Sequence, residues 1–177
     1  MSVETLTFGC RLNTVESEVV RGHAEAGAEG RDLVVVNTCA VTAEAGRQAR
    51  KAIRRLARER PGAEIVVTGC GAEVERAHYA DMPEVARLVG NAAKLRPESW
   101  RNGAVPPPED IMAVRTAEPT RILGMNGHTR AFVPVQNGCD HRCTFCVIPF
   151  GRGNSRSVPV AEAVAQVRRI VEHGGRE

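Results

Sequence analysis

The 177-residue sequence has few aromatic residues, no long apolar run and no strong excess of either charge. One Trp, one Tyr and four Phe are present, so the core must be built from Ala, Val, Leu and Ile. The longest aliphatic runs, such as 33–36, are the length of a strand. A membrane helix needs about 20 consecutive apolar residues, and the sequence contains no run of that length, so we do not expect a membrane-spanning helix. The net charge of +3 says little by itself about partners.

The start of the chain also lacks a targeting signal. Residues 1–4 have neither the basic start nor the apolar stretch of a signal peptide. We therefore expect a soluble, cytoplasmic protein that does not associate with a membrane. In a reducing cytosol, six cysteines are not expected to form a disulfide framework. Metal binding or redox chemistry is the better explanation for them.

The first hundred residues repeat one pattern, in which a short apolar strand leads through a turn into an amphipathic helix. Strands are expected at 4–8, 33–36, 64–68 and 87–90, and helices at about 15–26, at 43–59 and after residue 71. This alternation predicts an α/β fold with a parallel sheet and right-handed crossovers. We assign residues 1–99 to this N-terminal domain.

A cysteine follows each of the first three expected strands, namely Cys10, Cys39 and Cys70 (the edge cysteines). The carboxyl ends of parallel strands share one edge of the sheet, where ligands usually bind. The edge cysteines are therefore expected to be neighbours in space, although they are far apart in the sequence. Helix N-termini at this edge favour thiolates. The alternative is that each cysteine is only a small buried apolar residue.

The expected helix at 43–59 has a basic face beside its apolar one. The basic stripe consists of Arg47, Arg50, Lys51, Arg54, Arg55 and Arg58. Such a face is either a solvated surface or a contact for a phosphate backbone, and the sequence leaves both interpretations open.

The repeating pattern ends near Trp100. The run Pro106-Pro107-Pro108 and its charged flanks are typical of a linker, which we place at 100–129. Residues 130–177 then form a second unit with a strand at about 130–136, a cysteine-rich loop and a helix at about 160–172. This last helix is expected to leave an apolar face unburied.

The loop of the second unit contains the pattern C-x3-C-x2-C, formed by Cys139, Cys143 and Cys146 (the loop cysteines). Zinc sites usually combine two separated cysteine pairs into four ligands, whereas here three cysteines come from one tight loop. Three thiolates on a four-iron cluster leave one iron open for a substrate, so the spacing favours a [4Fe–4S] cluster over zinc. Arg152 and Arg156 follow the loop and are candidates either for contacts to substrate phosphates or carboxylates or for the surface.

These motifs resemble a known family. The loop, with Phe145 before its last cysteine, resembles the radical S-adenosylmethionine enzymes. The cysteine motifs 8–13 (Phe-Gly-Cys-Arg-Leu-Asn), 37–42 (Asn-Thr-Cys-Ala-Val-Thr) and 68–70 (Thr-Gly-Cys) resemble the three cluster motifs of the methylthiotransferases. Within that family they are most similar to the enzymes that act on N6-threonylcarbamoyladenosine at position 37 of tRNA.

The resemblance implies two [4Fe–4S] clusters. The loop cysteines would hold one cluster, whose open iron binds S-adenosylmethionine and, once reduced, generates a radical from it. The edge cysteines would hold the second cluster, which carries the sulfur to be inserted. The implied partners are the anticodon loop of tRNA around adenosine 37 and an electron donor such as flavodoxin or ferredoxin.

The resemblance also implies that this chain is truncated. Family members continue through a partial α/β barrel and an RNA-binding β-domain, so residues 130–177 would be only the first strand, loop and helix of the radical domain. We expect the 177-residue chain to be inactive alone. Two alternatives stay open: a methylthiotransferase of the isopentenyladenosine type, and a non-catalytic iron–sulfur or zinc RNA-binding module.

Overall fold

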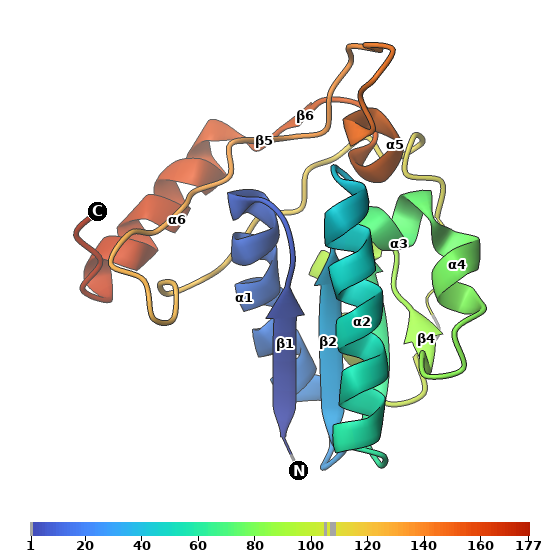
Figure 1. Cartoon of the computed structure of the whole chain (residues 1–177). Coiled ribbons are helices and arrows are strands. Elements are labelled where there is room, and N and C mark those ends of the chain that lie inside the picture. Colours follow the sequence, from blue (N-terminus) through green and yellow to red (C-terminus); the bar gives the residue numbers. More distant parts are fainter. Residues whose placement is uncertain (1, 105, 107–108) are drawn as a thin grey trace.

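A computed structural model describes residues 2–104, 106 and 109–177 of the chain. The N-terminal part is built on a four-stranded parallel sheet whose strands lie side by side in chain order (Figure 1). The strands are β1 (Val3–Thr7), β2 (Leu33–Thr38), β3 (Glu64–Gly69) and β4 (Arg87–Leu88). All three pairings are parallel, which confirms the predicted α/β fold.

Helices cover both faces of this sheet. They are α1 (Arg11–Gly27), α2 (Ala43–Glu59), α3 (Cys70–Val74) and α4 (Arg76–Ala80), with the 3-10 turns η1 (Ala93–Leu95) and η2 (Pro97–Trp100). Helix α1 begins four residues before its expected start at residue 15, because its first turn is polar and the apolar periodicity begins only at Val15. Helix α2 has its expected bounds, and the Thr42 side chain caps it by accepting a hydrogen bond from the Ala45 N–H at 3.1 Å.

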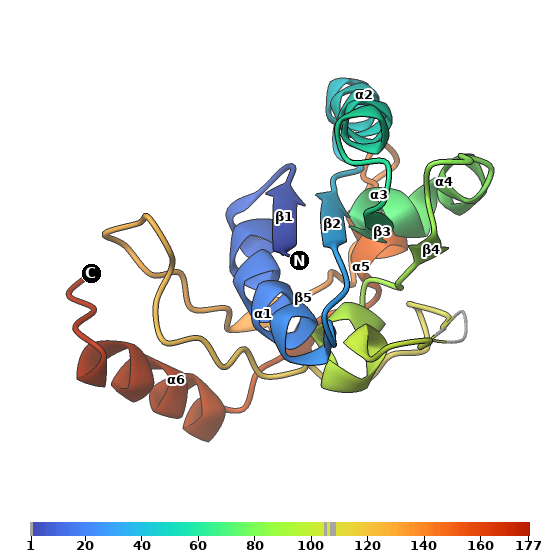
Figure 2. The same cartoon turned by 90° about the horizontal axis from the view of Figure 1, so that it is seen from below.

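Two separate apolar layers fix the helices on opposite faces. Ile53 and Leu56 of α2 pack with Val34, Val36, Ile65, Val67 and Tyr79, whereas Val20 and Ala24 of α1 pack with Leu33, Val35, Val66 and Trp100. Every residue of β2 is buried, as expected for a strand covered on both sides. Figure 2 shows α2 and α1 on either side of the sheet.

The placement of the helices corrects one expectation. With parallel strands in chain order, right-handed crossovers would put every helix on the same face and leave the other face open to water. Here α1 covers the face opposite α2, so the β1–α1–β2 connection is left-handed and the β2–α2–β3 connection is right-handed (Figures 1 and 2). The general preference for right-handed crossovers is thus overridden by the burial of both faces of an aliphatic sheet.

The C-terminal part contains little regular structure. Its elements are β5 (Gln136–Asn137), α5 (Ile148–Arg152), β6 (Arg156–Ser157) and α6 (Val160–Glu172). The prediction of a strand over 130–136 is wrong, because only Gln136 of that range is in a strand, and β5 pairs antiparallel with β6. Within the described residues, 131–135 form no ladder with a strand, although the Val135 carbonyl accepts a hydrogen bond from the Val158 N–H at 2.9 Å, so the segment stays an extended loop.

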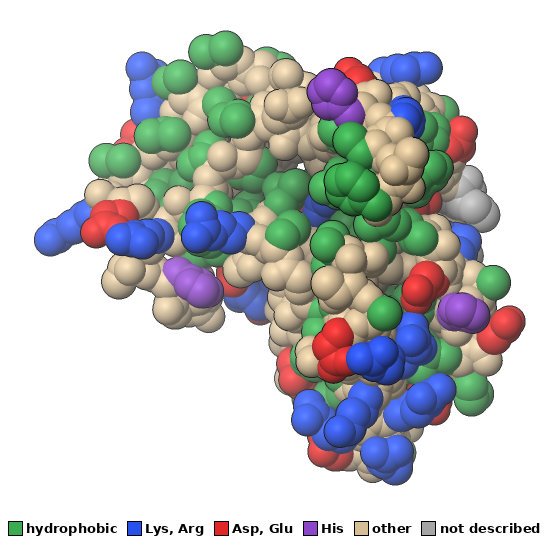
Figure 3. Space-filling view, turned by 45° about the horizontal axis from the view of Figure 1, so that its top comes forward, with side chains coloured by type: hydrophobic (Ala, Val, Ile, Leu, Met, Phe, Trp, Pro, Cys, Tyr) green, Lys and Arg blue, Asp and Glu red, His purple; other side chains and the backbone are tan. Residues whose placement is uncertain are grey.

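Helix α6 has the bounds expected from the sequence. Its valines Val160, Val164, Val167 and Val171 are between 44% and 80% exposed, which confirms the unburied apolar face. Apolar side chains accordingly gather at this end of the molecule in Figure 3.

The segment expected to be a linker lies against the N-terminal domain. No helix or strand occurs in the described residues between 101 and 135. Ile122 and Met125 of this segment nevertheless pack on Val15 and Val19 of α1. Pro107 and Pro108 lie outside the described residues, and the domain boundaries at 99 and 129 stay a prediction. In the described part of the chain, the length and apolarity that a membrane span requires are found in no helix.

Candidate cysteine site at the sheet edge

The three edge cysteines lie at the carboxyl edge of three neighbouring strands. Cys10 precedes the first turn of α1, Cys39 follows β2 directly, and Cys70 opens α3. The strand register pairs Thr38 with Gly69, so Cys39 and Cys70 leave the sheet at the same level. Cys39 is buried, Cys70 is partly buried and Cys10 is exposed. The fold therefore brings the three turns to one edge, as the sequence predicted.

Glycine lets these turns approach one another closely. Gly9 has a φ of +101°, and a Cβ atom there would lie 2.7 Å from both Cβ and Sγ of Cys39. A Cβ atom at Gly71 would lie 2.8 Å from Thr38 Oγ1 and 3.1 Å from the Cys39 carbonyl oxygen. Larger side chains at Gly9 and Gly71 would push the turns apart, so both glycines are required by the close packing around Cys39.

Two buried polar side chains tie the same turns together. The Asn13 amide donates hydrogen bonds to the carbonyl oxygens of Phe8, at 2.7 Å, and Thr38, at 3.1 Å. The Thr38 hydroxyl donates to the Thr68 carbonyl at 2.6 Å and accepts from the Ala72 N–H at 2.9 Å. Because each turn depends on a neighbour for its backbone hydrogen bonds, the three turns form one unit.

A buried cluster of three charged side chains, Glu16, Lys94 and Arg152, lies next to this edge of the sheet. The Glu16 carboxylate lies 2.7 Å from Lys94 Nζ and 2.8 and 3.0 Å from the two terminal nitrogens of Arg152. Lys94 also donates to Asn37 Oδ1 at 3.3 Å. Lys94 is fully buried, and Glu16 is 1% exposed. A carboxylate this deep is held in its charged form only by such partners.

The charges of this cluster shift the pKa values around it. Burial acts to raise the pKa of Glu16, but Lys94 and Arg152 together hold it below the ordinary value. Burial raises the pKa of the Cys70 thiol, while the charges of Arg152 and Lys94 act in the opposite direction. Burial and the nearby cations thus act on the pKa of Cys70 in opposite directions, and the effect of burial is the larger one.

The loop cysteines lie in a turn that extends beyond α5 at the top of Figure 1. The Cys139 N–H donates to the Gly153 carbonyl at 3.1 Å, and the Cys146 N–H donates to the Cys143 carbonyl at 3.0 Å. Cys143 is exposed, and the other two are partly buried. The loop is thus closed at its base on Gly153, which follows α5, and Cys143 is its most exposed cysteine.

The structure shows that the two arginines after the loop are buried. Arg152 and Arg156 are only 5% and 6% exposed, so a surface role is wrong for both. Arg156 donates to the carbonyl oxygens of Arg152, at 2.8 Å, and Asn154, at 3.1 Å. Glu16, the acidic partner of Arg152, was not among the residues predicted from the sequence. The available signal was an acidic residue among the apolar positions Val15, Val19 and Val20 of α1.

No three His, Cys, Asp or Glu side chains in the described part of the chain are close enough to hold one metal ion. The thiolates around an iron–sulfur cluster bind different irons, so they need not converge on one point. The donor set fits such a cluster in two respects: three thiols share an edge, and buried cations beneath them favour an anionic group. The assignment of the six cysteines as iron ligands stays a prediction.

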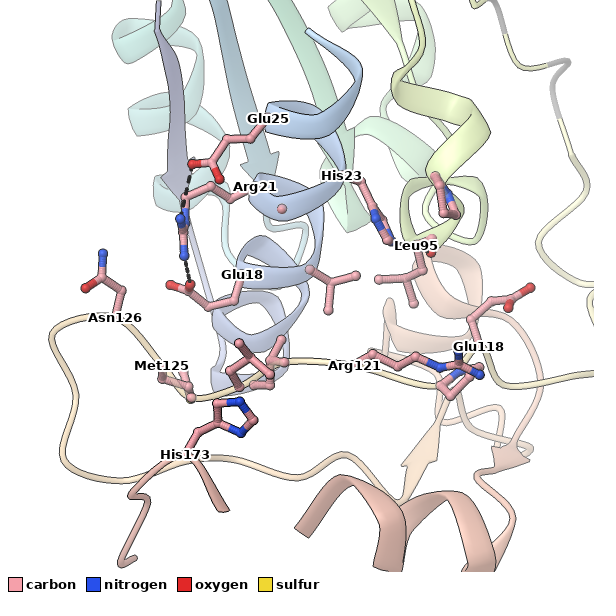
Figure 4. Close-up of a pocket in the computed structure, with 17 residues that line it drawn as sticks. Glu18, Arg21, His23, Glu25, Leu95, Glu118, Arg121, Met125, Asn126 and His173 are labelled. Atoms are coloured by element: carbon pink, nitrogen blue, oxygen red, sulfur yellow. Dashed lines mark hydrogen bonds and ion pairs between the residues drawn. The ribbon is translucent and has the colours of Figure 1, made fainter. Parts of the chain in front are cut away.

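One hollow in the described part of the molecule lies away from the cysteines. It has a volume of about 890 Å³ and is bounded by α1, by the segment around 118–126 and by His173. Figure 4 shows Arg21 in this groove between Glu18 and Glu25, with which it forms ion pairs at 2.6 and 3.1 Å. None of the six cysteines lines this groove.

Comparisons with known proteins agree with these motifs. Residues 2–90 match the model of "Uncharacterized protein family UPF0004". The chain is 44% identical over 176 residues to "Threonylcarbamoyladenosine tRNA methylthiotransferase MtaB" of Rickettsia prowazekii (strain Madrid E), covering 98% of this chain and 41% of the relative. It is 34% identical to the protein of the same name from Bacillus subtilis (strain 168), covering 97% of this chain and 41% of the relative.

A relative with another substrate in its name also matches. The chain is 34% identical to "tRNA-2-methylthio-N(6)-dimethylallyladenosine synthase" of Sorangium cellulosum (strain So ce56), covering 97% of this chain and 39% of the relative. The chain thus spans about two fifths of the length of these curated relatives. It belongs to the UPF0004 family, and the resemblance to the methylthiotransferases that its cysteine motifs indicated is confirmed.

Proposed function

We propose that this chain supplies the cysteine-bearing part of a tRNA methylthiotransferase, which converts N6-threonylcarbamoyladenosine at position 37 to its 2-methylthio derivative. The observation that carries the proposal is the meeting of three distant cysteine turns at one sheet edge. An isolated buried cysteine needs no such arrangement, whereas a cluster with one open iron needs three thiolates side by side. The names of the relatives support the reaction and the substrate.

In this proposal the edge cysteines hold one [4Fe–4S] cluster and the loop cysteines hold a second one, which binds S-adenosylmethionine. When bound, these groups would supply radical chemistry and the sulfur, with flavodoxin or ferredoxin as the electron donor. The chain's own contribution is to hold the two sets of ligands in fixed positions. Asn13 and Thr38 join the three turns of the edge, and Arg152 joins the base of the loop to α1.

The threonylcarbamoyl substrate is favoured over the isopentenyl one by the identities of 44% and 34% to relatives with those names. The motif after Cys10 agrees with this preference, and its side chains have defined places in the structure. The Arg11 guanidinium lies 5.3 Å from the centre of the Phe132 ring, so the first turn of α1 contacts the segment that leads into the loop.

The basic stripe of α2 is the surface that we assign to the tRNA. Basic side chains gather over this helix in Figure 3. Four members of the stripe lie near carboxylates, as the pairs Arg47–Glu44, Arg50–Glu75, Arg54–Glu84 and Arg55–Glu59. Lys51 is exposed, and within the described residues it has no ion-pair partner. A helix with basic side chains that are not paired with carboxylates suits contact with a phosphate backbone. If tRNA is the substrate, the protein acts in the cytoplasm.

Nucleoside mass spectrometry of tRNA tests the proposal. A strain lacking the full-length gene should lose the 2-methylthio derivative and accumulate N6-threonylcarbamoyladenosine. The full-length gene should restore the modification, and so should a Val41→Ala control, because Val41 is 62% exposed and two residues from Cys39. Cys39→Ala and Cys143→Ala should not restore it. Loss of the isopentenyladenosine derivative instead would support the alternative substrate, and rescue by Cys39→Ala would contradict the proposal.

Iron analysis of the purified chain tests the two clusters separately. After anaerobic reconstitution we expect about eight irons per chain, and about four when either set of three cysteines is replaced by Ala. One zinc and no iron would support the non-catalytic RNA-binding module. About four irons in the unchanged chain would remove one of the clusters from the proposal.

A further inference from the structure

Arg152 links two parts of the chain that are far apart in the sequence. Its side chain extends from the last turn of α5 into the N-terminal domain, where it pairs with Glu16 and donates to Asn13 Oδ1. It also donates to Asn137 Oδ1 at 3.0 Å, at the start of the cysteine loop. One buried guanidinium therefore contacts both α1 and the base of the loop. The loop cannot move relative to the sheet edge without breaking these contacts.

Among the described residues, the buried cations around Arg152 outnumber the carboxylates that pair with them. Glu16 is the only carboxylate within ion-pair distance of Arg152 or Lys94 among the described residues. Two buried cations thus share one buried anion, and Arg156, whose ion pairs are likewise absent from the described part, adds a third cation beside them. An excess of positive charge in a poorly solvated site is costly unless an anion lies nearby.

The edge cysteines are where that anion would lie. A Cβ atom at Gly151, next to Arg152, would be 2.9 Å from Cβ of Cys70. The Asn91 amide donates to Cys70 Sγ at 3.5 Å and also to the Gly151 carbonyl oxygen. The excess charge is therefore directed at the cysteine edge.

We propose that Arg152 is a positioning residue that fixes the cysteine loop on the sheet edge and raises the reduction potential of the cluster bound by Cys10, Cys39 and Cys70. This inference rests on the proposed function, because it requires that cluster. Reduction adds negative charge to a cluster, so a fixed buried cation stabilises the reduced form, and a fixed anion destabilises it. Arg152 and Glu16 should therefore act on the potential with opposite signs.

The test uses the full 177-residue chain with the loop cysteines replaced by Ala, so that a single cluster is observed. Its reduction potential is measured by a redox titration followed by electron paramagnetic resonance. Arg152→Met should shift the potential to more negative values, and Glu16→Gln should shift it to more positive values. Arg152→Lys keeps the charge and should leave the potential nearly unchanged. Arg58→Met is the matched control, because it removes an exposed cation from the last turn of α2, far from the edge.

The outcomes separate the two proposals. Opposite shifts for Arg152→Met and Glu16→Gln support the inference, because a general loosening of the site would move both potentials in the same direction. Bound iron with unchanged potentials, or with shifts of the same sign, overturns the inference and leaves the proposed function intact. A chain that binds no iron through the edge cysteines overturns both. If Arg152→Met does not fold, the sign of the Glu16→Gln shift and the behaviour of Arg152→Lys still decide the matter.

Discussion

Replacing Glu16 by Gln should destabilise the protein more than any exchange of a surface carboxylate. Glu16 is 1% exposed and accepts charged hydrogen bonds from Lys94, at 2.7 Å, and Arg152, at 2.8 and 3.0 Å. Removing one partner from a buried ion pair costs about 3–5 kcal/mol, because the remaining charge is left without compensation. For a domain of this size that corresponds to a decrease in Tm of roughly 6–20 °C.

Urea denaturation of the wild-type chain and two variants measures this effect. The matched control is Glu25→Gln in the same helix, because Glu25 is half-exposed and its ion pair with Arg21, at 3.1 Å, is of the i, i+4 kind. Such a surface pair contributes only about 0.5 kcal/mol. The midpoint of Glu16→Gln should decrease at an unchanged slope. If the two variants have the same stability within about 1 kcal/mol, the buried cluster does not stabilise the fold as argued.

The same carboxylate predicts a pH dependence. Although burial opposes it, Lys94 and Arg152 keep the pKa of Glu16 in the folded state below its ordinary value of 4.5. Folding therefore favours the charged form, and the contribution of Glu16 is fully present above pH 4.5. It is lost as the pH falls through the folded-state pKa. The difference in stability between the wild-type chain and Glu16→Gln should accordingly narrow in acid; a difference that grows as the pH is lowered would refute this assignment of charges.

Three further predictions concern the turns and the basic stripe. Thr38→Val should cost about 1–3 kcal/mol in urea denaturation, because it leaves two buried backbone groups without partners; a neutral effect would show that the hydroxyl does not join the turns. Gly9→Ala should lower the iron content of the reconstituted chain, because the new methyl group would overlap Cys39, whereas Gly103→Ala, also at positive φ but in open space, should not. Lys51→Glu should weaken tRNA binding by the full-length enzyme and reduce its salt dependence, and an unchanged salt slope would remove α2 from the interface.

Much of the fold could be predicted because its signals are local. The aliphatic run at 33–36 predicted a strand buried on both faces, and every residue of β2 is buried. The bounds of α2 and α6 were predicted from periodicity, since their apolar positions repeat with the helical period over more than three turns. The strand expected at 130–136 failed for the opposite reason. A strand depends on a continuous ladder with a partner strand, and within the described residues 131–135 have only isolated backbone hydrogen bonds, from Val158 N–H to the Val135 carbonyl and from Ala131 N–H to the Glu177 carbonyl.

The candidate site likewise has features that could be predicted from the sequence and features that could not. The positions of the edge cysteines after β1, β2 and β3 could be predicted, because strand ends in a parallel sheet share one edge. The role of Arg152 could not be predicted, since its partner Glu16 lies 136 residues away and only folding brings them together. The buried polar contacts of Asn13 had no local signal either, because the helix that carries it begins before the apolar pattern does.

The sequence by itself determined the α/β class, the basic face of α2 and the two sets of three cysteines, because these follow from composition, spacing and periodicity along the chain. Only the tertiary structure decided that α1 and α2 cover opposite faces of the sheet and that one crossover is left-handed. It also decided that a single buried carboxylate holds Lys94 and Arg152 beneath the edge cysteines. Both results depend on burial and on contacts between residues that are far apart in the sequence. Local patterns along the chain do not encode such contacts.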